Sequence, residues 1–135
     1  MTRINTLAIL VSIIFYNALL SQNATITIKN KSDRFVNVKL MQGPERKAVI
    51  YKTDSVAPKG TLVLDVFETG LYFTKLRAIL YDKKYPDKND TIFSKNRPMQ
   101  LISDKKRGHS NVTIEFTIKE SKNESMSITR KEYDN

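Results

Sequence analysis

Residues 111–119 read NVTIEFTIK, and apolar and polar side chains alternate along the whole stretch. In an extended strand this period of two places Val112, Ile114, Phe116 and Ile118 on one face and polar side chains on the other. A strand with one face to bury and one to leave in water is typical of antiparallel sheets. The stretch therefore predicts a half-buried strand of an antiparallel sheet.

Segments with the same strand character recur toward both ends of the chain, and clusters of Asn, Asp, Gly and Pro separate them. The further strand candidates are Thr25–Lys29, Val36–Leu40, Ala48–Lys52, Thr61–Phe67, Leu71–Tyr81, Thr91–Phe93, Met99–Ile102 and Ser125–Arg130. Roughly seven to nine short strands with no competing amphipathic helix favour a β-sandwich. We predict an all-β fold, an antiparallel two-sheet β-sandwich of the Ig-like or transthyretin-like kind, with a small closed barrel as the alternative.

The N-terminus has the features of a secretory signal peptide. Arg3 precedes the apolar run Leu7–Tyr16, and the small residue Ser21 follows at a position where a signal peptidase can cleave. An uncleaved membrane anchor is the alternative, but the run is shorter than the ~20 residues that a spanning helix needs. We predict a signal-peptide helix over residues 1–21 cleaved after Ser21, a β-sandwich domain over 22–130 and a disordered tail over 131–135. The protein is then secreted or periplasmic.

The chain is strongly basic and contains no cysteine. Its formal charge is +9, and removal of Arg3 with the signal leaves +8. Such an excess favours polyanionic partners, whereas a lysine-rich solubilising surface is the alternative. The lack of cysteine excludes disulfides, thiol catalysis and thiolate metal sites. Export argues against a nucleic-acid partner and leaves an anionic glycan, a lipid surface or a protein at the envelope as expected partners.

No motif with known catalytic chemistry appears. The single histidine, His109, lies in a basic turn without an orienting partner nearby in sequence. Residues 87–90 (DKND) offer oxygen ligands but lack the glycine and the terminal Glu of a calcium loop. Nucleotide-binding and hydrolase motifs are also missing. We expect a protein that is not an enzyme and that holds neither a metal nor a cofactor.

Basic residues and an aromatic residue of the second half supply the best candidate ligand site. They lie in or beside predicted loops, and two such loops at one end of a sandwich would form a cationic patch. Aromatic rings among cations can stack on sugars while the charges hold acidic groups. The candidate ligand-binding residues are Lys83, Lys84, Tyr85, Lys95, Arg97, Lys105, Lys106 and Arg107.

Asn-x-Ser/Thr sequons occur more often than this composition gives by chance. In a eukaryotic secretory pathway they would mark exposed glycosylated positions, whereas bacterial β proteins rich in Asn, Ser and Thr carry them without meaning. A eukaryotic secreted N-glycoprotein is therefore an open alternative. The sequon residues are Asn23, Asn30, Asn89, Asn111 and Asn123.

Part of the chain resembles a known module. The junction at residues 21–23 (SQN) is followed by two strand patterns, the stretch Thr53–Val56, a turn with Gly60 and the triplet Gly70-Leu71-Tyr72. Over Ile26–Leu76 this is similar to the small β-sandwich module that precedes thioredoxin-like domains in exported proteins of Bacteroidetes-type bacteria. No CxxC motif follows. The resemblance therefore implies a stand-alone module without catalytic residues.

The leading hypothesis is an exported, non-enzymatic binding or structural module at the cell envelope or outside the cell. Its edge strands are candidates for pairing with another chain, Ser125–Arg130 first. The alternative is a ligand-binding module for anionic polysaccharide or lipid head groups that uses a basic loop. An enzyme with unrecognised carboxylate chemistry is the third hypothesis.

Overall fold

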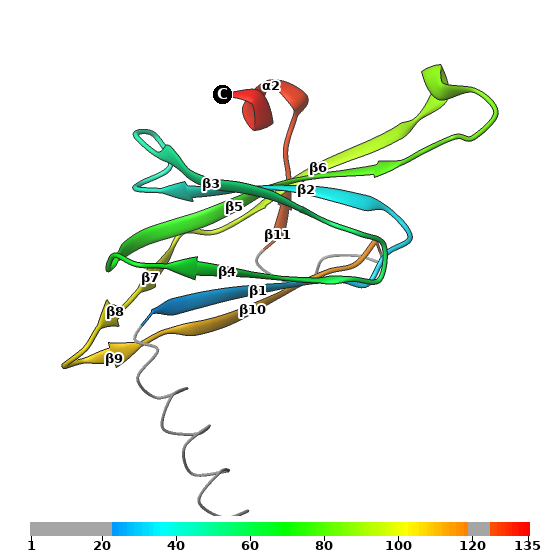
Figure 1. Cartoon of the computed structure of the whole chain (residues 1–135). Helices are drawn as coiled ribbons and strands as arrows, with labels where there is room; N and C mark the ends of the chain where they lie inside the picture. Colours follow the sequence, from blue (N-terminus) through cyan, green and yellow to red (C-terminus); the bar gives the residue numbers. More distant parts are fainter. Residues whose placement is uncertain (1–22, 119–124) are drawn as a thin grey trace, which may run out of the picture.

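The computed structural model describes residues 23–118 and 125–135, so the predicted signal peptide and Asn123 lie outside the described residues. It shows an all-β protein whose two main sheets stack face to face (Figure 1). The predicted two-sheet β-sandwich is confirmed. The strands are β1 (Ala24–Asn30), β2 (Phe35–Gln42), β3 (Val49–Val56), β4 (Thr61–Val66), β5 (Gly70–Leu80), β6 (Asp90–Asn96), β7 (Met99–Leu101), β8 (Ser103–Asp104), β9 (Gly108–His109), β10 (Asn111–Phe116) and β11 (Ser125–Ser127).

The larger sheet has the strand order β11-β6-β5-β2-β3, and β7 pairs with β5 beyond the end of β6. The smaller sheet has the order β10-β1-β4, and β8 and β9 form a separate hairpin. A single 3₁₀ turn, η1 (Pro86–Lys88), interrupts the loop between β5 and β6. This β5–β6 hairpin reaches out beyond the body of the sandwich (Figure 1).

The alternation of apolar and polar residues along the strands explains which side chains form the core. The inward positions of both sheets carry aliphatic and aromatic side chains, and full burial of each stabilises the fold by about 1.5–3 kcal/mol. The outward positions are mostly polar. The core cluster consists of Ala24, Ile26, Ile28, Val36, Val38, Leu40, Val56, Leu64, Val66, Tyr72, Leu76, Ala78, Leu101 and Phe116.

The stretch 111–119 that identified the fold differs from its prediction at two points. β10 pairs with β1 in parallel, with Ile28 opposite Ile114, although the other strand pairs are antiparallel. A parallel pair requires a long connection, which the intervening strands provide. The strand also ends at Phe116, because its partner β1 ends at Asn30. Ile118 is consequently exposed, not buried.

A buried asparagine organises the turn between β1 and β2. Asn30 Nδ2 donates to the carbonyls of Arg34 (2.6 Å) and Ala57 (3.1 Å), and its Oδ1 accepts from the backbone N–H and the hydroxyl of Ser32. Arg34 in turn donates to the backbone and carboxylate of Asp90 at the start of β6. These bonds fix one end of the sandwich by joining both sheets.

The C-terminal residues are ordered, in contrast to the disordered tail expected over 131–135. After β11, the chain forms the short helix α2 (Arg130–Asp134), whose N-cap Thr129 accepts a hydrogen bond from the N–H of Glu132. Tyr133 is buried, and α2 lies on the outer face of the larger sheet (Figure 1). Of the predicted strand Ser125–Arg130, the part Ser125–Ser127 pairs as β11, and α2 begins at Arg130.

Candidate anion-binding groove

Three of the predicted ligand residues lie in the β5–β6 hairpin. Lys83, Lys84 and Tyr85 are exposed at its tip, where the ammonium groups of Lys84 and Lys88 lie 5.7 and 5.2 Å from the centre of the Tyr85 ring. Asp82 shapes this tip, because its carboxylate accepts from the backbone N–H groups of Lys84 and Tyr85. The hairpin presents cations on a convex tip.

Three more predicted residues, Lys105, Lys106 and Arg107, form the turn of the β8–β9 hairpin and are exposed. Asp104 accepts from the N–H of Lys106 (2.8 Å) and from Arg107 Nε (3.1 Å), and these bonds lower the pKa of its carboxyl group. Gly108 closes the turn with a φ of +96°, a conformation that glycine adopts without strain.

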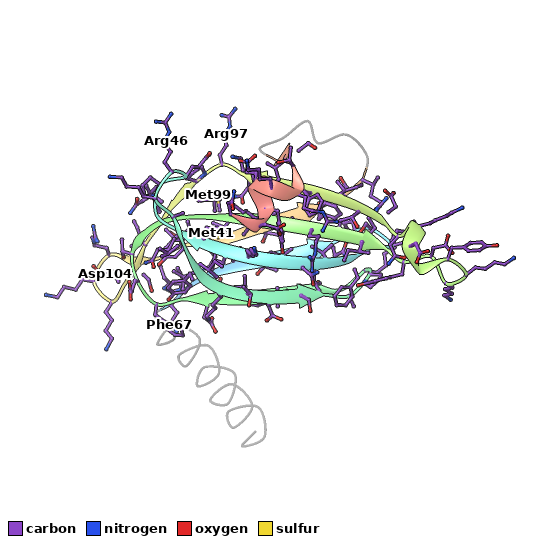
Figure 2. The ribbon with its side chains drawn as sticks, turned by 90° about the horizontal axis from the view of Figure 1, so that it is seen from above. Met41, Arg46, Phe67, Arg97, Met99 and Asp104 are labelled. Atoms are coloured by element: carbon purple, nitrogen blue, oxygen red, sulfur yellow. The ribbon has the colours of Figure 1, made fainter. Side chains whose placement is uncertain are left out.

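These two hairpins lie at opposite ends of the sandwich, the first beside η1 and the second at β8 and β9 (Figure 1). Figure 2, seen from above, shows the same separation, with Asp104 far from the β5–β6 tip. The structure therefore does not bring Lys83–Tyr85 and Lys105–Arg107 into one cationic patch.

Lys95 and Arg97 have different surroundings. The ammonium group of Lys95 forms ion pairs with Glu132 (2.5 Å) and Glu45 (3.0 Å), and only 13% of its side chain is exposed. These hydrogen-bonded carboxylates raise the pKa of Lys95. Lys95 is therefore a partner of α2 and not an exposed ligand residue. Arg97 is exposed and points outward on the same side as Arg46 (Figure 2).

A groove of about 310 Å³ opens on the outer face of the larger sheet, beside α2. We call it the Arg77 groove. It is lined by Asn37, Val38, Lys39, Thr53, Asp54, Ser55, Arg77 and Tyr133. Its volume is at the lower end of the range that small-ligand sites occupy.

Strand register brings the polar lining together. Asn37 of β2 lies opposite Ser55 of β3 on one side and Arg77 of β5 on the other. Lys39 lies opposite Thr53. The neighbours of Asn37 along β2, Val36 and Val38, are buried in the core, so alternation directs Asn37 and Lys39 to the outer face. The floor of the groove therefore consists of polar side chains from the paired strands β2, β3 and β5.

Positive charge dominates this groove. With its amide oxygen turned toward β5, Asn37 accepts from Arg77 Nε (3.0 Å) and Nη2 (2.6 Å). The guanidinium of Arg77 and the ammonium of Lys39 also lie 5.6 and 4.3 Å from the centre of the Tyr133 ring. Among the lining residues Asp54 is the single carboxylate. A fixed arginine beside a lysine and two hydroxyls suits an acidic ligand.

The described residues hold no cluster of three or more His, Asp or Glu that could bind a metal. His109 Nδ1 is buried and has no hydrogen-bond partner among them. The groove contains cations and hydroxyls, which together can bind an anion and form hydrogen bonds with its hydroxyl groups.

Sequence reasoning did not find Lys39, Arg77 or Tyr133. The signal was present in the outward positions of the two strand patterns, where Asn37 and Lys39 alternate with Val36, Val38 and Leu40. It was not recognised because polar residues on the outward face of a strand usually face only water.

The asparagines of the sequons differ in how far they are buried. Asn30 is buried and both its amide atoms are engaged, so it cannot carry a glycan in this fold, contrary to the exposure expected of a glycosylated position. Asn111 is exposed, and Asn23 and Asn89 are partly buried. Asn23, Asn89 and Asn111 therefore remain accessible candidates.

Comparisons with protein-family models, with curated proteins and with solved structures found no match. Among residues 23–118 and 125–135, no helix has the length and apolar character that crossing a membrane requires.

Proposed function

We propose that this protein is an exported, non-enzymatic binding module that holds an acidic sugar of an extracellular or envelope polysaccharide in the Arg77 groove. The observation that carries the proposal is the position of Arg77, whose guanidinium is held by Asn37 beside Lys39 at the edge of an open groove. A pre-oriented guanidinium can form paired hydrogen bonds with a carboxylate or sulfate at little further entropic cost.

The rest of the lining favours a sugar over a simple anion. Thr53 and Ser55 add exposed hydroxyls along β3, and each can donate to or accept from a ligand hydroxyl. A uronic acid offers one carboxylate and several hydroxyls on a small ring, which matches this mixture. A lipid head group carries a phosphate, and Arg77 could bind this group as well. The test therefore includes a phosphate compound as a probe.

Pairing through an edge strand has less support. β11 has only three residues, and α2 follows it closely. β3, the other edge of the larger sheet, has an irregular register near Tyr51, and Lys52 donates to the carbonyl of Asp65 (2.9 Å). Bulges and lysines are features that protect edge strands from pairing with other chains.

Retention on an immobilised acidic polysaccharide across a salt gradient tests the proposal. Two double variants remove the same amount of charge: Lys39→Gln/Arg77→Gln in the groove and Lys105→Gln/Lys106→Gln in the β8–β9 hairpin. We expect the groove variant to elute at clearly lower salt than the hairpin variant. Equal elution of both would show that binding follows net charge alone, and earlier elution of the hairpin variant would move the site to the basic loop.

Free glucuronate and glycerol phosphate then act as competitors in the same experiment. Elution of the unmodified protein by glucuronate at the lower concentration supports the sugar site. Preferential elution by glycerol phosphate would contradict it and indicate a phosphate-bearing ligand.

A further inference from the structure

Beside the Arg77 groove, three lysines lie in one row across the larger sheet. The strand register places Lys39 of β2 opposite Lys75 of β5, and Lys75 opposite Lys95 of β6. We call these three residues the lysine row. Its ammonium groups rise from adjacent strands, which are spaced by about 4.8 Å.

Helix α2 supplies the acceptors for this row. Lys39 Nζ donates to the carbonyl of Tyr133 (3.0 Å), and Lys75 Nζ donates to the carbonyl of Glu132 (2.7 Å). Lys95 reaches the carboxylate of Glu132 and that of Glu45. Each ammonium group of the row therefore has an oxygen acceptor on α2.

The row is electrostatically unfavourable without such acceptors. Like charges directly opposite one another destabilise a sheet, and three cations stand here against two carboxylates. Burial and the neighbouring charge of Lys39 lower the pKa of Lys75. A ligand that carries more negative charge than α2 would match the row better.

The attachment of α2 is limited. The helix has five residues, too few to be stable alone in water. Tyr133 anchors it by packing on Phe93 (5.5 Å between ring centres) and under Lys39, and Thr129 caps its start. Lys39 and Tyr133 line the Arg77 groove as well, so the groove and the covered row are continuous.

We infer that the lysine row is a second anion-binding subsite, which α2 covers and which an acidic polysaccharide uncovers when its first sugar lies in the Arg77 groove. This inference rests on the proposed function. The acidic groups of successive sugars would then accept hydrogen bonds from the three lysines. They would replace the two carbonyls and the carboxylate that α2 now supplies. The row runs across three adjacent strands, so a chain of acidic sugars that lies across these strands passes each lysine in turn.

The test compares glucuronate with a hexamer of glucuronic acid on the full mature chain. Titration calorimetry gives the two affinities, and amide hydrogen exchange reports the protection of residues 130–135. We expect both ligands to bind, but only the hexamer to speed exchange in α2. A hexamer that binds while α2 keeps its protection would overturn the second subsite and leave the proposed function intact.

Two variants outside the groove test whether α2 competes with the polysaccharide for the lysine row. Thr129→Ala removes the N-cap, and Glu132→Gln removes the carboxylate that competes for Lys95. Thr129→Ala should raise the affinity for the hexamer by about five-fold, the effect of one lost cap. Glu132→Gln should also raise it, and both variants should leave the affinity for glucuronate unchanged. Unchanged hexamer affinity in both variants would contradict the inference. Failure of both ligands to bind the unmodified protein would overturn the proposed function and this inference together.

Discussion

The side-chain oxygen of Asn96 accepts hydrogen bonds from both the backbone N–H (2.6 Å) and the hydroxyl (2.5 Å) of Thr74, which lies 22 residues earlier in the chain. Thr74 stands where β5 changes partners, since β6 pairs with β5 from Lys75 onward and β7 pairs with it at Gly70–Tyr72. The amide oxygen of Asn96 thus satisfies the backbone N–H of Thr74, which pairs with neither β6 nor β7. Both residues are buried.

Asn96→Ala should therefore destabilise the protein. The change leaves two buried groups of Thr74 without an acceptor, and the expected cost is about 2–4 kcal/mol. Urea denaturation followed by circular dichroism measures it. Gln100→Ala, an exposed position on β7, is the control and should stay within about 0.5 kcal/mol of the unmodified protein. Equal stability of the two variants would contradict this role of Asn96.

Alkaline pH should weaken the fold through Tyr72. Burial, with the nearby Tyr51 and Glu68, raises the pKa of Tyr72 from 10.0 to about 12. The neutral phenol is favoured in the folded state, so its contribution is complete below pH 10 and is lost as the pH rises from 10 to 12. The loss amounts to about 2–3 kcal/mol over this window.

Tyr72→Phe isolates this effect. At pH 7 the variant loses the hydrogen bond that the hydroxyl donates to the carbonyl of Glu68 (2.7 Å), and it should be less stable by about 1 kcal/mol. Between pH 10 and 12 the difference should shrink and change sign, because phenylalanine cannot ionise. Urea titrations at pH 7, 10 and 12 give the three differences. A constant difference across the series would show that Tyr72 titrates normally.

Glycosylation should discriminate among the sequons. If the mature chain is made in a glycosylating eukaryotic host, folded protein should carry no glycan on Asn30, because this side chain is buried and bonded on both amide atoms. Asn111 is exposed and can be modified. Glycopeptide mass spectrometry measures the occupancy of each position. A well-folded fraction with Asn30 occupied would contradict the structure of the β1–β2 turn.

Strand alternation predicted the sandwich because inward positions are apolar over nearly every strand. Val36, Val38 and Leu40 identify β2 without any other information. The parallel partner of β1 could not be predicted in this way, since period two gives the face of a residue and not the neighbouring strand. Helix α2 was also missed, because five residues contain too little of a helical period and their stability comes from contacts with the sheet.

The candidate site was less predictable than the fold. Predicted basic residues stand out in the sequence as clusters in loops, and the structure places Lys83–Tyr85 and Lys105–Arg107 at opposite ends. The groove residues are single cations at outward strand positions. Their partners come from far along the chain, as with Lys39 and Tyr133, which are 94 residues apart. Only the folded structure brings such pairs together.

The most direct test of an acidic-sugar site is a nuclear magnetic resonance titration of the isotope-labelled mature chain with glucuronate. The side-chain signals of Arg77 Nε–H and of the Asn37 amide should shift in a saturable manner, and those of the exposed Arg46 and Arg97 should not. Arg77→Gln should abolish the shift at Asn37, whereas Arg97→Gln, with the same loss of charge, should preserve it. Shifts that are equal at Arg46, Arg77 and Arg97, or that do not saturate, would contradict a site in the Arg77 groove.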